Sequence, residues 1–219
     1  MDNNAVVGYA LKADIRHYFE SVDHGILLER IETKIKDEKI LWLIKTILEN
    51  HKTGVPGKGM PLGNLTSQFF ANVYLDGFDH FVKHGLKARY YLRYVDDFVI
   101  LHRDRKILED WKVRIDSFLR DRLELELHPE KSKVIPLRKG ITLLGFRVFY
   151  RHRLLKKSNA RRIWKRLERF RQMCDMGEMD RPEVVQSLEG WLAYAGFTDS
   201  YNLRRKVVAR FNGLFGNAG

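Results

Sequence analysis

The feature that most constrains this chain is a pair of β-rich runs interrupted by two adjacent aspartates. The segment RYYLRYVDDFVILH, from Arg89 to His102, has the aromatic and β-branched content of two strands joined by a turn. Asp96 and Asp97 lie at the tip of this predicted hairpin. Two neighbouring carboxylates repel each other, and a turn that benefits from one aspartate does not require two. The pair therefore indicates either an acidic site or simply a polar turn.

A third carboxylate belongs to Asp14, at the C-terminal end of a strand predicted over residues 8–15. If that strand lies beside the hairpin, the three carboxylates converge. Mg²⁺ prefers such hard oxygen ligands, and two ions held this way support phosphoryl transfer. The alternative is that Asp14 only caps the end of its strand.

The remaining pattern predicts an α+β protein. Asp23 and Asp37 are suited to cap the first two of its predicted helices. Short strands are expected over residues 123–155, and a soft boundary near Lys156 separates a domain of residues 1–157 from a helical one of residues 158–219. The helices are predicted over residues 24–35, 38–48, 64–84 and 104–122, and from Ser158 onward with breaks near Gly177 and Gly196.

The charge balance favours a polyanionic partner. Forty Lys and Arg against 28 Asp and Glu give a formal charge of +12, and residues 151–171 hold ten basic residues but only one acidic residue, Glu168. The alternative is a solvated basic surface without a ligand. The basic residues at helical spacing, which we predict to bind nucleic acid, are Arg161, Arg162, Lys165, Arg166 and Arg169.

Composition excludes several other classes of protein. The apolar content of 44% is typical of a folded domain, and no apolar run approaches a membrane span. A single cysteine, Cys174, excludes an internal disulfide and fits a reducing compartment. We therefore expect a cytoplasmic protein without a membrane partner.

Five segments, in order, resemble the motifs of reverse transcriptases. The hairpin YVDD is similar to the YxDD motif of that family, and the segment from Asp14 to Phe19 resembles its first catalytic-aspartate motif. GMPLGNLTSQ at residues 59–68 resembles the motif that contacts the template and the nucleotide. LHPEKSK at residues 127–133 is similar to the lysine-bearing motif, and Leu144, Gly145 and Phe146 resemble the primer-grip hairpin.

The resemblance implies a polymerase palm, a small antiparallel sheet backed by helices, followed by a helical thumb. It implies RNA-directed DNA synthesis by two-metal nucleotidyl transfer, with two Mg²⁺ ions or Mn²⁺ in their place. The implied partners are an RNA template, a DNA or RNA primer and dNTPs.

Roles for individual residues also follow from the resemblance. Asp14, Asp96 and Asp97 would be metal ligands, with the Ile15 carbonyl as an extra ligand. Lys131, or alternatively Lys133, would be a proton donor or charge partner for the departing pyrophosphate, and the motif favours Lys131. The residues that would contact the nucleotide or template are Phe19, which would exclude a 2′-hydroxyl, together with Leu62, Gly63, Ser67 and Gln68. Leu144, Gly145 and Phe146 would hold the primer end.

The form LGNLTSQ resembles the enzymes of diversity-generating retroelements, which copy with errors and are expected to use an accessory protein. Leu62, in place of the family's usual Gln, removes a hydrogen bond to the nucleotide and predicts low fidelity. A phage-defence or unassigned bacterial reverse transcriptase is one alternative, and a non-catalytic RNA-binding fragment is another. Only 13 residues precede Asp14, so we expect the fingers to be largely missing and the chain alone to have weak or no activity.

Overall fold

The computed structural model describes residues 6–50, 55–61, 63 and 65–216. The chain divides into two compact units, one spanning Val7–Pro136 and the other beginning at Leu137. This division falls earlier than the domain boundary predicted at residue 157, because the strands just before that point group with the helices that follow them.

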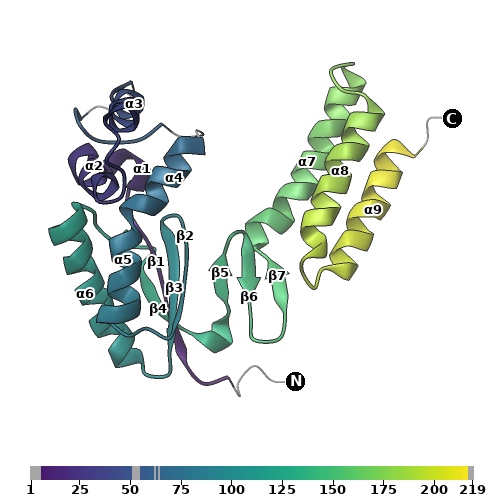
Figure 1. Cartoon of the computed structure of the whole chain (residues 1–219). Helices are drawn as coiled ribbons and strands as arrows, with labels where there is room; N and C mark the ends of the chain where they lie inside the picture. Colours follow the sequence, from purple (N-terminus) through teal and green to yellow (C-terminus); the bar gives the residue numbers. More distant parts are fainter. Residues whose placement is uncertain (1–5, 51–54, 62, 64, 217–219) are drawn as a thin grey trace. The chain divides into compact units, whose positions relative to one another are not determined.

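The first unit is built on a four-stranded antiparallel sheet in the order β2-β3-β1-β4 (Figure 1). Its strands are β1 (Tyr9–Asp14), β2 (Tyr90–Tyr94), β3 (Asp97–His102) and β4 (Lys133–Pro136). The predicted hairpin is confirmed, with Val95 and Asp96 as its two-residue turn and Asp97 as the first residue of β3 rather than part of the tip.

Helices cover one face of this sheet. Phe98 and Ile100 on that face are fully buried, and the Phe98 ring lies 5.1 Å from the ring of Phe78. Successive side chains of a strand alternate between faces, so the opposite face carries Tyr90, Leu92 and Tyr94, each more than 50% exposed. The helices of this unit are α1 (Tyr18–Ser21), α2 (His24–Glu32), α3 (Glu38–Glu49), α4 (Leu65–Tyr74), α5 (Asp76–His80), the π-helical turn Phe81–Gly85, and α6 (Arg105–Leu123).

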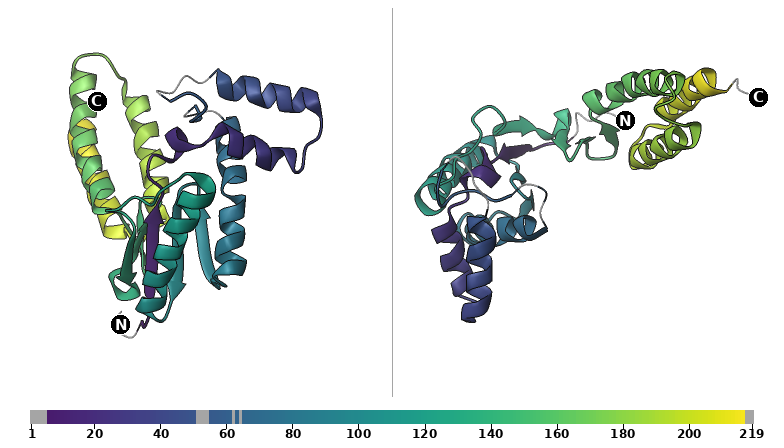
Figure 2. Two further views of the ribbon diagram at one scale, coloured as in Figure 1. Left: turned by 90° about the vertical axis from the view of Figure 1, so that its left-hand side faces the viewer. Right: turned by 90° about the horizontal axis from the view of Figure 1, so that it is seen from above.

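The helical predictions hold with one correction. Asp23 and Asp37 cap α2 and α3 as expected, each accepting hydrogen bonds from backbone N–H groups in the first turn. The single helix predicted over residues 64–84 is wrong, because the chain breaks at Leu75 between α4 and α5 and then widens into a π-helical turn. Figures 1 and 2 show α2, α3 and α4 grouped beyond the end of the sheet at which β1 finishes.

The second unit joins a three-stranded antiparallel sheet to a three-helix bundle. The strands are β5 (Ile141–Leu143), β6 (Phe146–Val148) and β7 (Arg153–Leu155), and the helices are α7 (Lys157–Asp175), α8 (Arg181–Gly196) and α9 (Tyr201–Phe215), after a 3-10 turn at Leu137–Lys139. The bundle has its own core, formed by the apolar sides of α7, α8 and α9. That core consists of Ile163, Leu167, Phe170, Val184, Leu188, Val207, Phe211 and Phe215. The α+β class is therefore confirmed.

The turn between β5 and β6 is held from the helical side. Leu144 and Gly145 both have positive φ, +50° and +84°, as a tight two-residue hairpin turn requires. The Gly145 carbonyl accepts a hydrogen bond from the Lys156 N–H at 2.9 Å. A Cβ at Gly145 would lie 2.3 Å from the Tyr194 hydroxyl oxygen, so this turn and α8 leave no room for a side chain.

We expect Gly145→Ala to lower the free energy of unfolding by about 1–2 kcal/mol, because it combines a positive φ with a steric clash. Gly190→Ala is the matched control, since a Cβ at this helical position would meet nothing within 4 Å. That substitution should raise the stability by about 0.5–1 kcal/mol. Urea denaturation of the two variants measures both effects. A Gly145→Ala protein as stable as the parent would contradict this account of the turn.

Candidate active site

The strand register brings the three predicted carboxylates together. Asp14, the last residue of β1, lies directly opposite Asp97, the first residue of β3. Asp96 precedes Asp97 in the hairpin turn, and its carbonyl accepts a hydrogen bond from the Ile15 N–H at 3.3 Å. Residues directly opposite in an antiparallel pair project to the same face. Asp14, Asp96 and Asp97 therefore form an acidic group at the end of the sheet where β1 finishes and the β2–β3 hairpin turns.

The turn that presents Asp96 is strained. Val95 has a φ of +55°, in the left-handed region that β-branched residues rarely adopt. Such a conformation costs on the order of 1–3 kcal/mol and persists only where its surroundings hold it. Strained residues of this kind concentrate at functional sites, which agrees with the presence of Asp96 in this turn and of Asp97 directly after it.

Two lysines neutralise part of the acidic group. The Lys131 ammonium lies 2.5 Å from Asp14 Oδ2, and the Lys12 ammonium lies 2.8 Å from Asp97 Oδ1. The hydrogen bond to Asp14 raises the pKa of Lys131, whose side chain is 58% exposed. Lys12 was not among the site residues predicted from sequence, although its position two residues before Asp14 on the same strand already placed it on the same face.

Asp96 has no such cation among the ion pairs of the described residues. Burial raises its pKa to about 6, and a hydrogen bond with the Asp14 side chain and the negative charges of Asp14 and Asp97 act in the same direction. The site thus concentrates negative charge that the protein alone does not fully offset.

The donor chemistry of the site fits a divalent metal ion. Three carboxylates at one edge offer the hard oxygen ligands that Mg²⁺ takes, and both Asp14 and Asp97 already bind a cationic group. Within the described part of the chain, however, no three His, Cys, Asp or Glu side chains are arranged so that they could hold a metal ion. Asp14 and Asp97 instead hold the two lysine ammoniums.

The lysine-bearing segment is fastened to the end of β1. The Asp14 carbonyl accepts a hydrogen bond from the His128 N–H at 2.7 Å, and the Arg16 N–H donates to the Glu126 carbonyl at 2.9 Å. Ser132 is fully buried beside the Asp14 backbone. These contacts explain why Lys131 reaches Asp14 across 117 residues of sequence. Ile15 is 2% exposed and joins this region through a bridge to Leu127.

The predicted nucleotide and template residues lie around α1 and the start of α4. Phe19 is half-buried against the core, and its carbonyl accepts a hydrogen bond from the Met60 N–H at 2.7 Å. Gly63 is exposed with a φ of +87°. Leu62 lies outside the described residues.

Ser67 and Gln68 point to different environments. The Ser67 side chain is buried, at 1% exposure, and its hydroxyl has no hydrogen-bond partner among the residues described, whereas Gln68 is exposed. Of these two residues, only Gln68 is therefore accessible to a ligand in this structure.

The second unit carries the remaining predicted residues. Leu144 is 49% exposed at the tip of the β5–β6 turn, while the Phe146 ring packs 4.8 Å from the ring of Tyr194. Glu168, the one acidic residue in the basic segment, is paired with Arg210 of α9 at 2.5 Å. The predicted basic residues Arg161, Arg162, Lys165, Arg166 and Arg169 are all exposed on α7, opposite its buried apolar side.

We expect Asp96→Asn to raise the free energy of unfolding by about 1 kcal/mol at pH 8 without divalent metal. The raised pKa means that the folded state disfavours a charged Asp96, so the substitution removes a destabilising charge. The difference should shrink as the pH falls below about 6, where Asp96 becomes protonated. Urea denaturation at pH 8 and pH 5 measures it.

Glu130→Gln removes one negative charge from an exposed position near the site and is the matched control. Its stability should stay within about 0.5 kcal/mol of the parent. Equal effects of the two substitutions would show that net charge, rather than the acidic group, is responsible.

Comparison with known proteins places this geometry in a family. The model of the family described as reverse transcriptase (RNA-dependent DNA polymerase) matches residues 1–148. Protein YkfC of Escherichia coli (strain K12) is 25% identical over 186 residues, covering 68% of this chain and 47% of YkfC. The group II intron-encoded protein LtrA of Lactococcus lactis subsp. cremoris is 30% identical over 135 residues, covering 58% of this chain and 22% of LtrA. The chain thus spans about half the length of YkfC and under a quarter of LtrA.

Solved structures agree at the level of the fold. Telomerase from Candida albicans, in complex with a fragment of telomeric RNA, has a TM-score of 0.54 at 14% identity, over 96% of this chain and 40% of the telomerase. Apo telomerase from Candida tropicalis has a TM-score of 0.53 at 17% identity, over 67% of this chain and 32% of that chain. No helix in the described ranges has the length and apolar content needed to cross a bilayer.

The relatives include a group II intron-encoded protein, and the subgroup suggested by the LGNLTSQ segment of this sequence stays a prediction. The family itself is shown by the match over residues 1–148, which contains the strand ending in Asp14, the YVDD hairpin and the lysine-bearing segment. This chain therefore belongs to the reverse transcriptase family.

Proposed function

We propose that this chain carries out RNA-directed DNA synthesis by two-metal nucleotidyl transfer. The observation that supports this most is the register that sets Asp14 opposite Asp97, with Asp96 in the adjoining turn, in a member of the reverse transcriptase family. Asp14, Asp96 and Asp97 would hold two Mg²⁺ ions, or Mn²⁺ in their place, with the Ile15 carbonyl as a further ligand. Bound there, the ions would supply Lewis-acid stabilisation of the attacking and leaving oxygens.

The protein's own groups would serve binding and proton transfer. Lys131 is exposed beside Asp14, a position suited to donating a proton to the departing pyrophosphate or offsetting its charge. Phe19, fixed through its backbone to Met60, would contact the sugar and disfavour a 2′-hydroxyl. Exposed Gln68, with Gly63, Ser67 and Leu62, would contribute to the nucleotide and template site, with direct contact assigned to Gln68 because Ser67 is buried.

The second unit would bind the product duplex. The exposed Leu144 turn, with Gly145 and Phe146, would hold the primer end, and the basic side of α7 would follow the phosphate backbone. We propose the part of the chain up to residue 157 as the palm and residues 158–219 as the thumb, although the compact units divide at Leu137.

The assignment to a subgroup of reverse transcriptases rests on the sequence alone. The LGNLTSQ motif supports error-prone copying in a diversity-generating retroelement, where an accessory protein would be a further partner. A gene neighbourhood with a near-identical template and variable repeat, differing at template adenines, would support this assignment. Neighbouring defence genes without such repeats would favour a phage-defence enzyme instead.

Primer extension on an RNA template with Mg²⁺ tests the activity. We expect at most weak extension by the parent protein alone, a fall of about 100-fold or more in Asp97→Asn, and loss on chelation with EDTA that added Mg²⁺ reverses. Misincorporation concentrated at template adenines would support the subgroup. RNA binding that survives Asp97→Asn, together with no extension by the parent protein even when an upstream fingers segment is restored, would overturn the polymerase assignment in favour of an RNA-binding module.

The basic side of α7 generates a separate prediction. The triple substitution Arg161→Gln, Arg162→Gln and Lys165→Gln should weaken binding to an RNA–DNA duplex and lower the slope of log K against log salt by about 2–3, because each lost phosphate contact removes close to one unit. The control triple, Lys34→Gln, Lys36→Gln and Lys39→Gln, changes the net charge equally at exposed positions near α2 and α3. Equal slopes for the two triples would mean that only net charge matters.

A further inference from the structure

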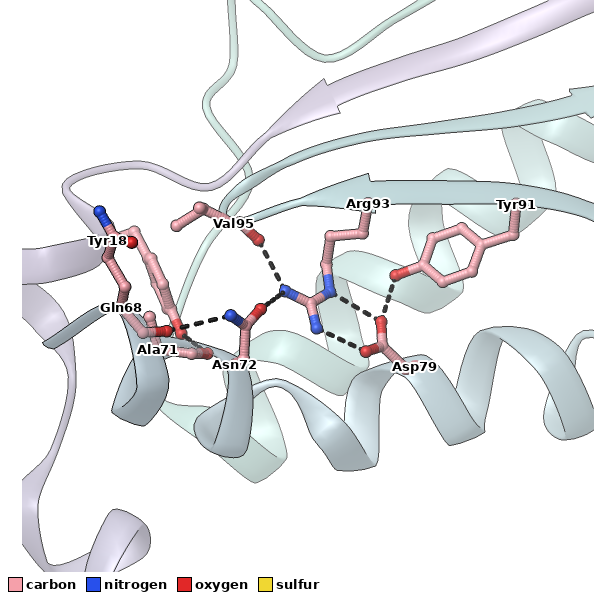
Figure 3. Close-up of polar contacts among 8 residues, drawn as sticks. All are labelled: Tyr18, Gln68, Ala71, Asn72, Asp79, Tyr91, Arg93 and Val95. Atoms are coloured by element: carbon pink, nitrogen blue, oxygen red, sulfur yellow. Dashed lines mark hydrogen bonds and ion pairs between the residues drawn. The ribbon is translucent and has the colours of Figure 1, made fainter. Parts of the chain in front are cut away.

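Arg93 of β2 is a nearly buried cation held by a fixed carboxylate. Its side chain is 9% exposed, and its Nε and Nη2 donate to Asp79 Oδ1 and Oδ2 at 2.7 and 2.5 Å. Figure 3 shows this fork together with the Tyr91 hydroxyl, which donates to the same Asp79 Oδ1 at 2.6 Å. Paired bonds of this kind fix a guanidinium in both position and plane. Asp79, on α5, therefore anchors Arg93.

The third nitrogen of the same guanidinium points away from Asp79. Arg93 Nη1 donates to the Val95 carbonyl at 2.9 Å and to Asn72 Oδ1 at 3.1 Å (Figure 3). The Asn72 amide in turn donates from Nδ2 to the Gln68 carbonyl at 3.0 Å. One side chain thus connects α5, the helical turn that carries Gln68, and the hairpin turn.

The bond to Val95 acts at the strained point of that turn. Val95 has a φ of +55°, and its carbonyl belongs to the peptide plane that leads directly into Asp96. Because the peptide unit is planar, holding this carbonyl orients the N–H and Cα of Asp96. The Asp96 carbonyl, on the next peptide, accepts the bond from the Ile15 N–H that joins the turn to β1.

We propose that Arg93 is a positioning residue that sets the Val95–Asp96 turn relative to the helix carrying Gln68. Its catalytic consequence rests on the proposed polymerase function, in which the turn would bear a metal ligand and Gln68 would meet the template. Lysine cannot replace it, because an ammonium lacks the planar fork that reaches Asp79, Asn72 and the Val95 carbonyl together.

Amide hydrogen exchange of the whole chain tests the positioning without any catalysis. In Arg93→Lys, we expect exchange of the Ile15 amide to rise by about tenfold, the effect of losing one bond to a charged group. Amides in the middle of the β1–β3 pair, such as those of Leu11 and Ile100, should keep their rates. A uniform rise across the sheet, or no change at Ile15, would overturn the proposal.

Two further variants separate positioning from general stability. Tyr91→Phe removes a hydrogen bond to Asp79 but leaves the fork intact, so it should lower stability without changing exchange at Ile15. Asn72→Ala, at an exposed position, should raise exchange at Ile15 by a smaller factor. If Arg93→Lys does not fold, the Asn72→Ala result decides, and unchanged exchange in that variant overturns the proposal.

Primer extension then tests the catalytic consequence. Arg93→Lys should lower kcat while leaving the KM for the primer–template nearly unchanged, and Tyr91→Phe should keep both. A parent protein without activity would count against the proposed function alone, since the exchange measurement would still report on Arg93. Altered exchange at Ile15 with normal kcat would overturn the catalytic role.

Discussion

The antiparallel register of β1 against β3 is the constraint on which the site depends. It sets Asp14 opposite Asp97, and the two-residue turn then leaves no position for Asp96 except beside them. If the register of the two strands shifted by one residue, all the side chains of one strand would move to the other face of the sheet. A carboxylate would then be buried among Phe98, Ile100 and Phe78. The apolar core on the helical face therefore holds the acidic group together on the other.

Concentrating three carboxylates is unfavourable for folding, and the structure offsets only part of that cost. Lys12 and Lys131 pair with Asp97 and Asp14, while burial and neighbouring charge raise the pKa of Asp96 to about 6. The strained Val95 adds to the cost, and the Asp79–Arg93 pair holds it in place. A site of this kind is maintained by its surroundings, as is common where function rather than stability selects the residues.

Much of the fold was predictable because its signals are local. The aromatic and β-branched runs around Asp96 and Asp97 identified the hairpin, and the caps Asp23 and Asp37 identified two helix starts. The break at Leu75 was not predictable from spacing, because residues 64–84 keep an apolar composition through α4, α5 and the π-helical turn. Burial of the Ser67 side chain likewise depends on what packs against α4, which its neighbours in sequence do not specify.

The sequence by itself determined the family and the three acidic residues, since ordered motifs and residue types are properties of the chain. Only the tertiary structure decided which charges meet. Lys12 and Lys131 lie 85 and 117 residues from their carboxylate partners, and Arg93 reaches Asn72, Asp79 and the Val95 carbonyl at once. Such contacts depend on how strands and helices pack, because hydrogen bonds and ion pairs act over a few ångströms between groups that lie far apart in the sequence.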